Sequence, residues 1–151
     1  MSSKIYASHL SWWDLGPYKV REKLNQRILS IKAPLNPVKS IQNITIKNEK
    51  RSTPIRIYFP YKEKDIPIIL LIHGGAWVAG NLETHDNLAR YLCAETDALV
   101  LSVGYLNAPE GKFPFALEQC YDALNWIIEN AQTYSADSSK IAVVGDSAGG
   151  I

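Results

Sequence analysis

The sequence predicts an α/β fold built on a mostly parallel sheet, with helices on both faces. Three unbroken apolar runs, over residues 68–72, 98–101 and 141–144, have the length and composition of strands that are buried on both sides. Apolar residues at helical spacing separate these runs, over residues 81–96 and 113–131. Because strands that alternate with helices form parallel sheets, we expect the three runs to lie in one sheet.

A helical segment is expected near the start of the chain. Residues 8–30 carry apolar side chains at mixed helical spacing, interrupted at Gly16-Pro17. This pattern predicts one or two short amphipathic helices with a break at the Gly-Pro pair. We interpret Trp12 and Trp13 as packing the segment onto the body of the protein, with a substrate entrance as the alternative.

Two further strands are expected before the first buried run. Pro34 and Pro37 bracket a linker, and the strands follow over residues 40–48 and 55–59. Their apolar and polar residues alternate imperfectly, which indicates half-exposed strands. We therefore expect both of them at the edge of the sheet.

Composition excludes several classes of partner. Lys plus Arg (16) nearly balances Asp plus Glu (15), so no basic field favours nucleic acid or an anionic membrane surface. No run approaches the roughly 18 apolar residues of a membrane span, and the first nine residues lack the apolar core of a secretory signal. We expect a soluble, cytoplasmic protein. Cys93 and Cys120 lie far apart and are expected to be buried free thiols.

A Gly-x-Ser-x-Gly pattern directly follows the third apolar run, from Gly145 to Gly149. A glycine on either side of Ser147 leaves room for a strained strand-to-helix turn, which lifts the serine hydroxyl clear of its neighbours. A serine nucleophile needs that exposure. An ordinary glycine turn at a strand end is the alternative.

A second glycine pattern follows the first apolar run, at His73-Gly74-Gly75-Ala76. Attack of a serine on an ester carbonyl creates an oxyanion, and backbone N–H groups in a loop without bulky side chains can stabilise that charge. In parallel sheets, functional residues gather at the carboxyl ends of the strands. Both glycine patterns stand at such ends, and together they favour a catalytic interpretation.

The combined patterns resemble the α/β-hydrolase fold and, within it, the hormone-sensitive-lipase-like family of esterases. The family's hallmarks are His-Gly-Gly-Gly and Gly-Asp-Ser-Ala-Gly-Gly, to which residues 73–76 and 145–150 are similar. Residues 105–110, Tyr-Leu-Asn-Ala-Pro-Glu, and 113–118, Phe-Pro-Phe-Ala-Leu-Glu, are similar to the family's Tyr-Arg-Leu-Ala-Pro-Glu and Phe-Pro-Ala-Ala-Leu-Glu. The resemblance covers residues 68–151 and is loose before them.

This resemblance implies that Ser147 is the nucleophile. It implies that the backbone amides of Gly75, Ala76 and Ala148 form the oxyanion hole. Supporting positions in the two motifs are His73, Gly74, Gly145, Asp146 and Gly149. Ala76 stands where the family has a glycine, and the sequence leaves open whether alanine can adopt the dihedral angles of the loop.

Other motif positions are expected to be structural. Leu106 and Asn107 replace the family's Arg-Leu pair, so any contact made by that arginine is missing. Glu110 and Asp146 flank the two motif loops, and we expect them to be hydrogen-bonding residues rather than catalytic acids.

In this fold the nucleophile is followed by an Asp or Glu and then by a His. Only four residues follow Ser147, and His9, His73 and His85 all precede it. We therefore expect the chain to be a fragment, truncated after the nucleophile strand. The last buried strand would then be an open apolar edge, so the isolated chain is expected to express poorly or to associate.

The expected organisation has two parts. Residues 1–40 are predicted to form a cap-like helical segment and linker, and residues 41–151 the N-terminal half of an α/β-hydrolase domain. No metal, nucleotide or flavin site is visible, and the glycines lack the spacing of a dinucleotide fingerprint, so no cofactor is expected. The oligomeric state is left open.

The leading hypothesis for function is a serine carboxylic-ester hydrolase that forms an acyl-enzyme with small esters, most commonly short-acyl ones in this family. An amidase-type relative, such as a formamidase or deacetylase, would use the same nucleophile. A non-catalytic small-molecule-binding protein and an inactive remnant are the alternatives of a different class. On its own, the chain is expected to hydrolyse activated esters no faster than its Ser147→Ala variant.

Overall fold

The computed structural model describes residues 14–150. Its elements are α1 (Gly16–Leu29), β1 (Ser40–Lys47), β2 (Ser52–Phe59), β3 (Ile66–Ile72), α2 (Asp86–Thr96), β4 (Leu99–Val103), α3 (Phe115–Asn130), the 3-10 helix η2 (Ala131–Tyr134), β5 (Ala136–Gly145) and the 3-10 helix η3 (Ser147–Gly150). The proposed packing role of Trp12 and Trp13 lies outside the described residues. Helix α1 begins at the Gly16-Pro17 pair, where a break was predicted.

The five strands form one sheet in the order β1-β2-β4-β3-β5. Strand β3 lies between β4 and β5 and is parallel to both, whereas β2 is antiparallel to β1 and to β4. Every strand except β2 therefore runs in the same direction, which confirms the mostly parallel sheet. The edge position predicted for both early strands is wrong for β2, which has a hydrogen-bonded neighbour on each side and four buried residues among its eight.

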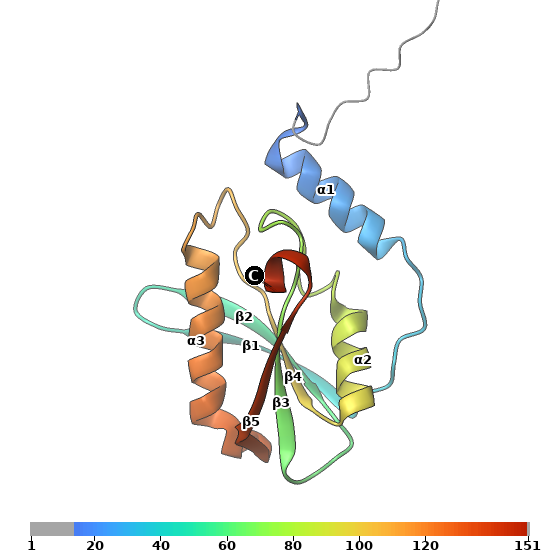
Figure 1. The fold of residues 1–151 in the computed structure, drawn as a ribbon, viewed down its shortest axis with the longest axis vertical. Coiled ribbons are helices and arrows are strands. Elements are labelled where there is room, and N and C mark those ends of the chain that lie inside the picture. Colours follow the sequence, from blue (N-terminus) through green and yellow to red (C-terminus); the bar gives the residue numbers. More distant parts are fainter. Residues whose placement is uncertain (1–13, 151) are drawn as a thin grey trace, which may run out of the picture.

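Alternate residues of the buried strands face two separate hydrophobic clusters. In β3, Ile68 and Leu70 belong to the cluster that α3 covers, whereas Ile69 and Leu71 belong to the cluster that α2 covers. Side chains three and four positions apart on one helix face close each cluster. These are Ala116, Cys120, Ala123 and Ile127 of α3, and Ala89 and Cys93 of α2. Helices thus cover both faces of the sheet, as predicted (Figure 1), and both cysteines are buried and free.

Helix α2 and strand β5 differ from their predicted bounds for local reasons. Helix α2 starts at Asp86 rather than at Asn81, because the side chain of Asn81 accepts hydrogen bonds from the amides of Glu83 and Thr84 and forms a separate turn. Strand β5 starts earlier than its apolar run. Its first half carries the polar stretch over residues 137–140, which lies at an irregularity in the pairing with β3.

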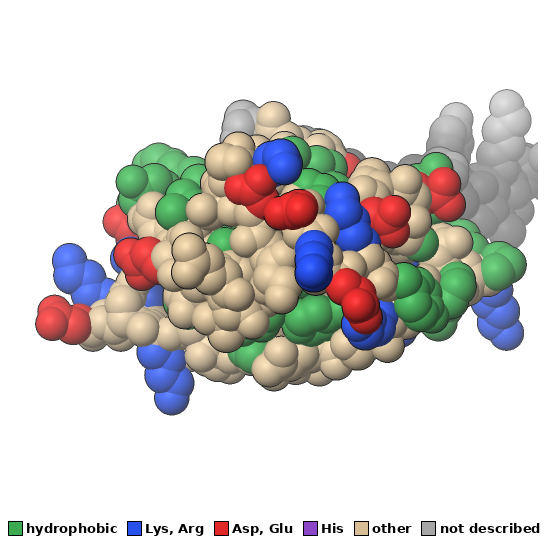
Figure 2. All heavy atoms as spheres, turned by 90° about the horizontal axis from the view of Figure 1, so that it is seen from below, with side chains coloured by type: hydrophobic (Ala, Val, Ile, Leu, Met, Phe, Trp, Pro, Cys, Tyr) green, Lys and Arg blue, Asp and Glu red, His purple; other side chains and the backbone are tan. Residues whose placement is uncertain are grey.

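The carboxyl ends of β3 and β5 point toward α1, at the end of the molecule where the chain also finishes (Figure 1). The opposite end, seen in Figure 2, presents acidic and basic side chains interspersed with one another. None of the helices in residues 14–150 is long and apolar enough to span a bilayer.

Candidate active site

The turn that follows β5, residues 145–150, is called the serine turn below. Ser147 is exposed and has a φ angle of 49°, in the left-handed region that non-glycine residues rarely adopt. The flanking glycines permit this turn, because a Cβ at Gly145 would lie 2.0 Å from the carbonyl oxygen of Gly149. A Cβ at Gly149 would lie 2.1 Å from the carbonyl oxygen of Ile72. The strained, exposed turn predicted from the sequence is therefore the one that the structure contains.

The loop that follows β3, residues 73–80, is called the glycine loop. Three successive residues have positive φ angles: Gly75 (128°), Ala76 (54°) and Trp77 (59°). Alanine therefore does adopt the backbone conformation at position 76, at a cost of about 1–2 kcal/mol relative to an ordinary helical conformation. Within residues 14–150, the amides of Gly75 and Ala76 donate to no acceptor. Both amides are free to bind an anion.

The glycine loop and the serine turn start side by side, because Ile72 and Gly145 are paired neighbours at the ends of β3 and β5. The amide of Gly74 donates a hydrogen bond of 2.8 Å to Oδ1 of Asp146. The approach is close enough that a Cβ at Gly74 would lie 2.3 Å from Oδ2 of Asp146. The structure thus brings the two predicted motifs together through Gly145 and Asp146, the two residues that precede the candidate nucleophile.

His73 is fully buried beneath the glycine loop. Its Nδ1 lies 2.9 Å from the carbonyl oxygen of Gly74, and its ring stacks on that of Tyr105 with centroids 4.0 Å apart. The Tyr105 hydroxyl donates to the carbonyl oxygen of His73 over 2.6 Å. Burial lowers the pKa of His73 to about 4, so the ring is neutral near pH 7. A neutral ring that is hydrogen-bonded to its own loop is consistent with a structural role for His73.

His85 is a site neighbour that no sequence pattern marked. Its Nε2 lies 3.2 Å from Oδ1 of Asp146, and its Nδ1 lies 2.9 Å from Oγ1 of Thr84. The ring therefore bridges the turn before α2 and the serine turn. Within the described residues, no hydrogen bond joins Ser147 Oγ to a histidine, so His85 acts on the residue before the nucleophile rather than on the nucleophile itself.

Glu110 makes a structural contact. Its carboxylate accepts two hydrogen bonds from Arg21 of α1, over 2.9 and 2.6 Å, and this contact lowers the pKa of Glu110. Three residues that approach the two loops from elsewhere in the chain carry no sequence signal: Arg21, Asn25 and His85. Their partners are far away along the chain, so no local spacing could have marked them.

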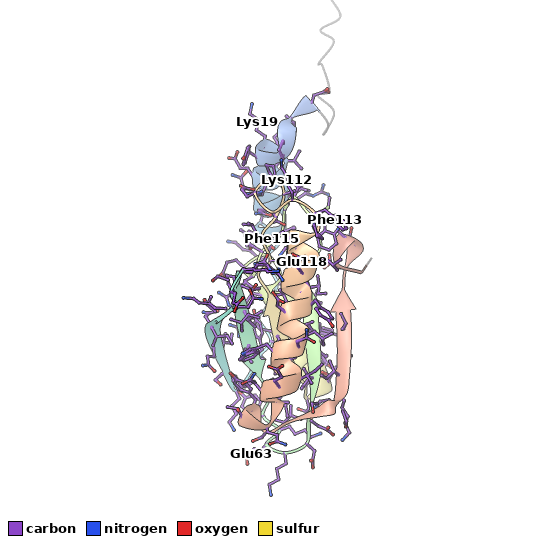
Figure 3. All side chains as sticks on the ribbon, turned by 90° about the vertical axis from the view of Figure 1, so that its left-hand side faces the viewer. Lys19, Glu63, Lys112, Phe113, Phe115 and Glu118 are labelled. Carbon is purple, nitrogen blue, oxygen red and sulfur yellow. The ribbon has the colours of Figure 1, made fainter. Side chains whose placement is uncertain are left out.

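An apolar pocket of about 320 Å³ opens beside the glycine loop. Trp77 forms one wall, and Phe113, Pro114 and Leu117 at the start of α3 form another. Figure 3 shows Phe113 at the end of α3 that lies toward the serine turn. An apolar group held here would lie beside the residues that carry the free amides.

The chain matches known proteins over most of its length. The model of a family described as having an alpha/beta hydrolase fold matches residues 69–151. An arylesterase of Saccharolobus solfataricus is 40% identical over 132 residues, which are 87% of this chain and 43% of the arylesterase. Carboxylesterase NlhH of Mycobacterium tuberculosis is 44% identical over 98 residues, which are 64% of this chain and 31% of that protein.

Solved structures agree with the sequence matches. A structure described as that of an arylesterase superimposes with a TM-score of 0.82 and 39% identity, and the match covers 88% of this chain and 44% of that one. This chain therefore spans less than half the length of the relatives that it matches. The fold, the motifs and these matches agree, and the chain belongs to the α/β-hydrolase fold family, in its hormone-sensitive-lipase-like group of esterases.

Proposed function

We propose that this chain carries the nucleophile and the oxyanion hole of a serine carboxylic-ester hydrolase that acts on small, short-acyl esters. Ser147 is the nucleophile in this proposal. The amides of Gly75, Ala76 and Ala148 bind the oxyanion. The observation that supports the proposal most directly is the juxtaposition of an exposed serine on a left-handed turn with a neighbouring loop in which the amides of Gly75 and Ala76 donate to no acceptor among the described residues.

The chemistry proceeds in two steps. Ser147 Oγ attacks the ester carbonyl carbon, and negative charge develops on the carbonyl oxygen where the backbone amides donate to it. The tetrahedral intermediate expels the alcohol and leaves an acyl-enzyme, which water then hydrolyses to the carboxylic acid. A base must take the proton of the serine hydroxyl. Since no described residue is hydrogen-bonded to Ser147 Oγ, the proposal takes that base from outside residues 14–150.

The apolar pocket supports a small substrate. Its volume of about 320 Å³ and its apolar lining suit a short acyl chain or a single ring. The names of the relatives, an arylesterase and a carboxylesterase, agree with esters as the substrate class. Amides remain the alternative substrates of the same nucleophile. The cytosolic location inferred from the sequence stays a prediction.

A chimera tests the proposal. This chain is joined to the part of the Saccharolobus solfataricus arylesterase that follows the aligned region, and hydrolysis of 4-nitrophenyl acetate is measured. We expect turnover in the chimera, loss of turnover in its Ser147→Ala variant, and slower cleavage of 4-nitroacetanilide than of the ester. A folded chimera without serine-dependent turnover would contradict the proposal.

The 151-residue chain alone provides the matched control. It is expected to hydrolyse 4-nitrophenyl acetate no faster than its own Ser147→Ala variant, because no base reaches Ser147 within the described residues. Serine-dependent turnover by the chain alone would show that the source of the base has been assigned wrongly.

A further inference from the structure

Helix α1 is held at the rim of the candidate active site by polar side chains. None of its residues is buried, and none belongs to either hydrophobic cluster. Figure 3 shows α1, labelled at Lys19, above the loop that carries Lys112. Hydrophobic packing on the two clusters therefore does not explain where α1 lies, and its polar contacts become informative.

Arg21 makes four hydrogen bonds, which reach the glycine loop and the loop between β4 and α3, residues 104–114. Its Nε donates to the carbonyl oxygen of Val78 and one Nη donates to that of Ala108, each over 2.7 Å. Both Nη atoms also donate to the carboxylate of Glu110, over 2.9 and 2.6 Å. The two hydrogen bonds to the Glu110 carboxylate fix the plane of the guanidinium. Its remaining N–H donors therefore point to the carbonyl oxygens of Val78 and Ala108.

Two further hydrogen bonds fix the backbone of Gly80, where the glycine loop ends. Its amide donates to Oδ1 of Asn25 over 2.9 Å, and its carbonyl oxygen accepts from Nδ2 of Asn107 over 2.9 Å. Asn25 is four residues after Arg21, so both side chains project from the same face of α1. Two side chains of one helix thus hold successive points of the glycine loop.

The glycine loop needs such restraints. Ala76 and Trp77 occupy the left-handed region, and backbone in that region persists only where the surroundings fix it. The loop's own turn supplies part of the restraint, since the amides of Val78 and Ala79 both donate to the carbonyl oxygen of Gly75. The carbonyls of Trp77, Val78 and Gly80 are all fixed by partners outside the loop, and the partner of Val78 is Arg21.

We propose that Arg21 is the positioning residue of the glycine loop: it couples α1 to the backbone that presents the free amides of Gly75 and Ala76. Its relevance to catalysis rests on the function proposed above. Arg21 acts through the backbone of Val78 and Ala108, and it touches no reacting atom in this account. Removal of its guanidinium releases the loop from its left-handed conformation without opening the sheet.

The test is residue-resolved amide hydrogen exchange on the 151-residue chain. Arg21→Gln is compared with Arg27→Gln, which makes the same charge change on an exposed position of the same helix. The reporters are the amides of Val78 and Ala79, which form the turn and do not bind Arg21. We expect Arg21→Gln to accelerate their exchange at least about tenfold, with no change at Leu101 in the core of β4.

Two results would overturn the proposal. One is exchange at Val78 and Ala79 that is no faster in Arg21→Gln than in Arg27→Gln. The other is an equal acceleration at Leu101, which would show a general loss of stability. Should Arg21→Gln fail to fold, Glu110→Gln is used instead, because it weakens the two hydrogen bonds between Arg21 and Glu110. The proposal then requires a smaller acceleration of amide exchange, confined to the glycine loop.

Steady-state kinetics of the chimera distinguish a failure of this proposal from a failure of the proposed function. In the arylesterase chimera, Arg21→Gln is expected to lower kcat several-fold with KM unchanged, because a displaced oxyanion donor is felt in the transition state. A rise in KM alone would contradict the positioning role. A chimera that is inactive even with Arg21 would contradict the proposed function, and the exchange result would still decide the role of Arg21.

Discussion

The amide of Gly74 donates a 2.8 Å hydrogen bond to Oδ1 of Asp146, and this bond joins the two loops at the carboxyl ends of β3 and β5. The same oxygen lies 3.2 Å from Nε2 of His85. Asp146 therefore connects the glycine loop, the serine turn and the turn before α2. Asp146 directly precedes Ser147, so these contacts hold the backbone beside the candidate nucleophile.

Removal of this carboxylate is expected to destabilise the chain. Asp146→Ala leaves the amide of Gly74 without its charged acceptor, which should lower the free energy of unfolding by about 1–2 kcal/mol. Asp146→Asn keeps an acceptor oxygen for the Gly74 amide and should lose about half as much. Urea denaturation followed by tryptophan fluorescence measures both variants. An unchanged midpoint in Asp146→Ala would contradict the connecting role.

Replacement of Ala76 by glycine is expected to stabilise the fold. Ala76 has a φ angle of 54°, and glycine adopts that conformation without the steric cost of a Cβ. We expect the free energy of unfolding to rise by about 0.5–1 kcal/mol in Ala76→Gly. The matched control is Ala94→Gly at an exposed position inside α2, where the same change should cost about 1 kcal/mol. Loss of stability in both variants would refute the strain at position 76.

The buried ring of His73 predicts a dependence of stability on pH. Its pKa is about 4 in the folded chain, against 6.5 for an unperturbed histidine, so the unfolded chain binds the proton more tightly. The contribution of His73 is complete above pH 6.5 and is lost as the pH falls from 6.5 to 4. Linkage sets the size of this loss at about 3 kcal/mol.

The measurement is the free energy of unfolding in urea at successive pH values for the wild type and for His73→Asn. Asparagine can place its Nδ2 near the position of the imidazole Nδ1, which binds the carbonyl oxygen of Gly74, but it does not titrate. The difference between the two curves should be flat above pH 6.5 and should change steadily below it. Parallel curves from pH 7 to pH 5 would mean that His73 does not stay neutral in the folded chain.

The parts of the fold that were predictable from sequence are those with local signals. The apolar runs that became β3 and β4 indicate burial on both faces by composition alone, and the glycines around Ser147 indicate a turn by their spacing. The run over residues 141–144 does form a strand, but the burial predicted for it is wrong, because β5 lies at the sheet edge and Ala142 and Val143 are exposed. The interior position of β2 was not predictable, because alternation along one strand does not say which strand pairs with it. The polar first half of β5 was missed because it lacks an apolar run.

The site neighbours were unpredictable for a different reason. Arg21 is 57 residues from Val78 and 89 residues from Glu110, and no spacing rule links such distant positions. In the sequence, His85 is one of three histidines upstream of Ser147, and no motif distinguishes it. Its contact with Asp146 depends on how the turn before α2 folds back over the carboxyl ends of the strands, which the sequence pattern does not encode.

The β5 edge leads to a prediction about association. Within residues 14–150, β5 pairs only with β3, and Val143 on this strand is 54% exposed. Figure 3 shows β5 at the margin of the sheet, beside α3. A strand that presents unpaired backbone groups and an apolar side chain favours pairing with another chain. We expect the 151-residue chain to form larger species as its concentration rises.

Charge at this edge should oppose that association. Val143→Lys places an ammonium group on the exposed side of β5, and lysine at a strand edge disfavours pairing with a second chain. The matched control is Thr45→Lys at an exposed position of β1, the opposite edge, whose outward side chains are already polar. Sedimentation velocity should show more monomer for Val143→Lys than for the wild type, and no shift for Thr45→Lys. Equal shifts toward monomer in the two lysine variants would indicate a general effect of charge. A wild-type chain that stays monomeric at all concentrations would contradict the predicted association through β5.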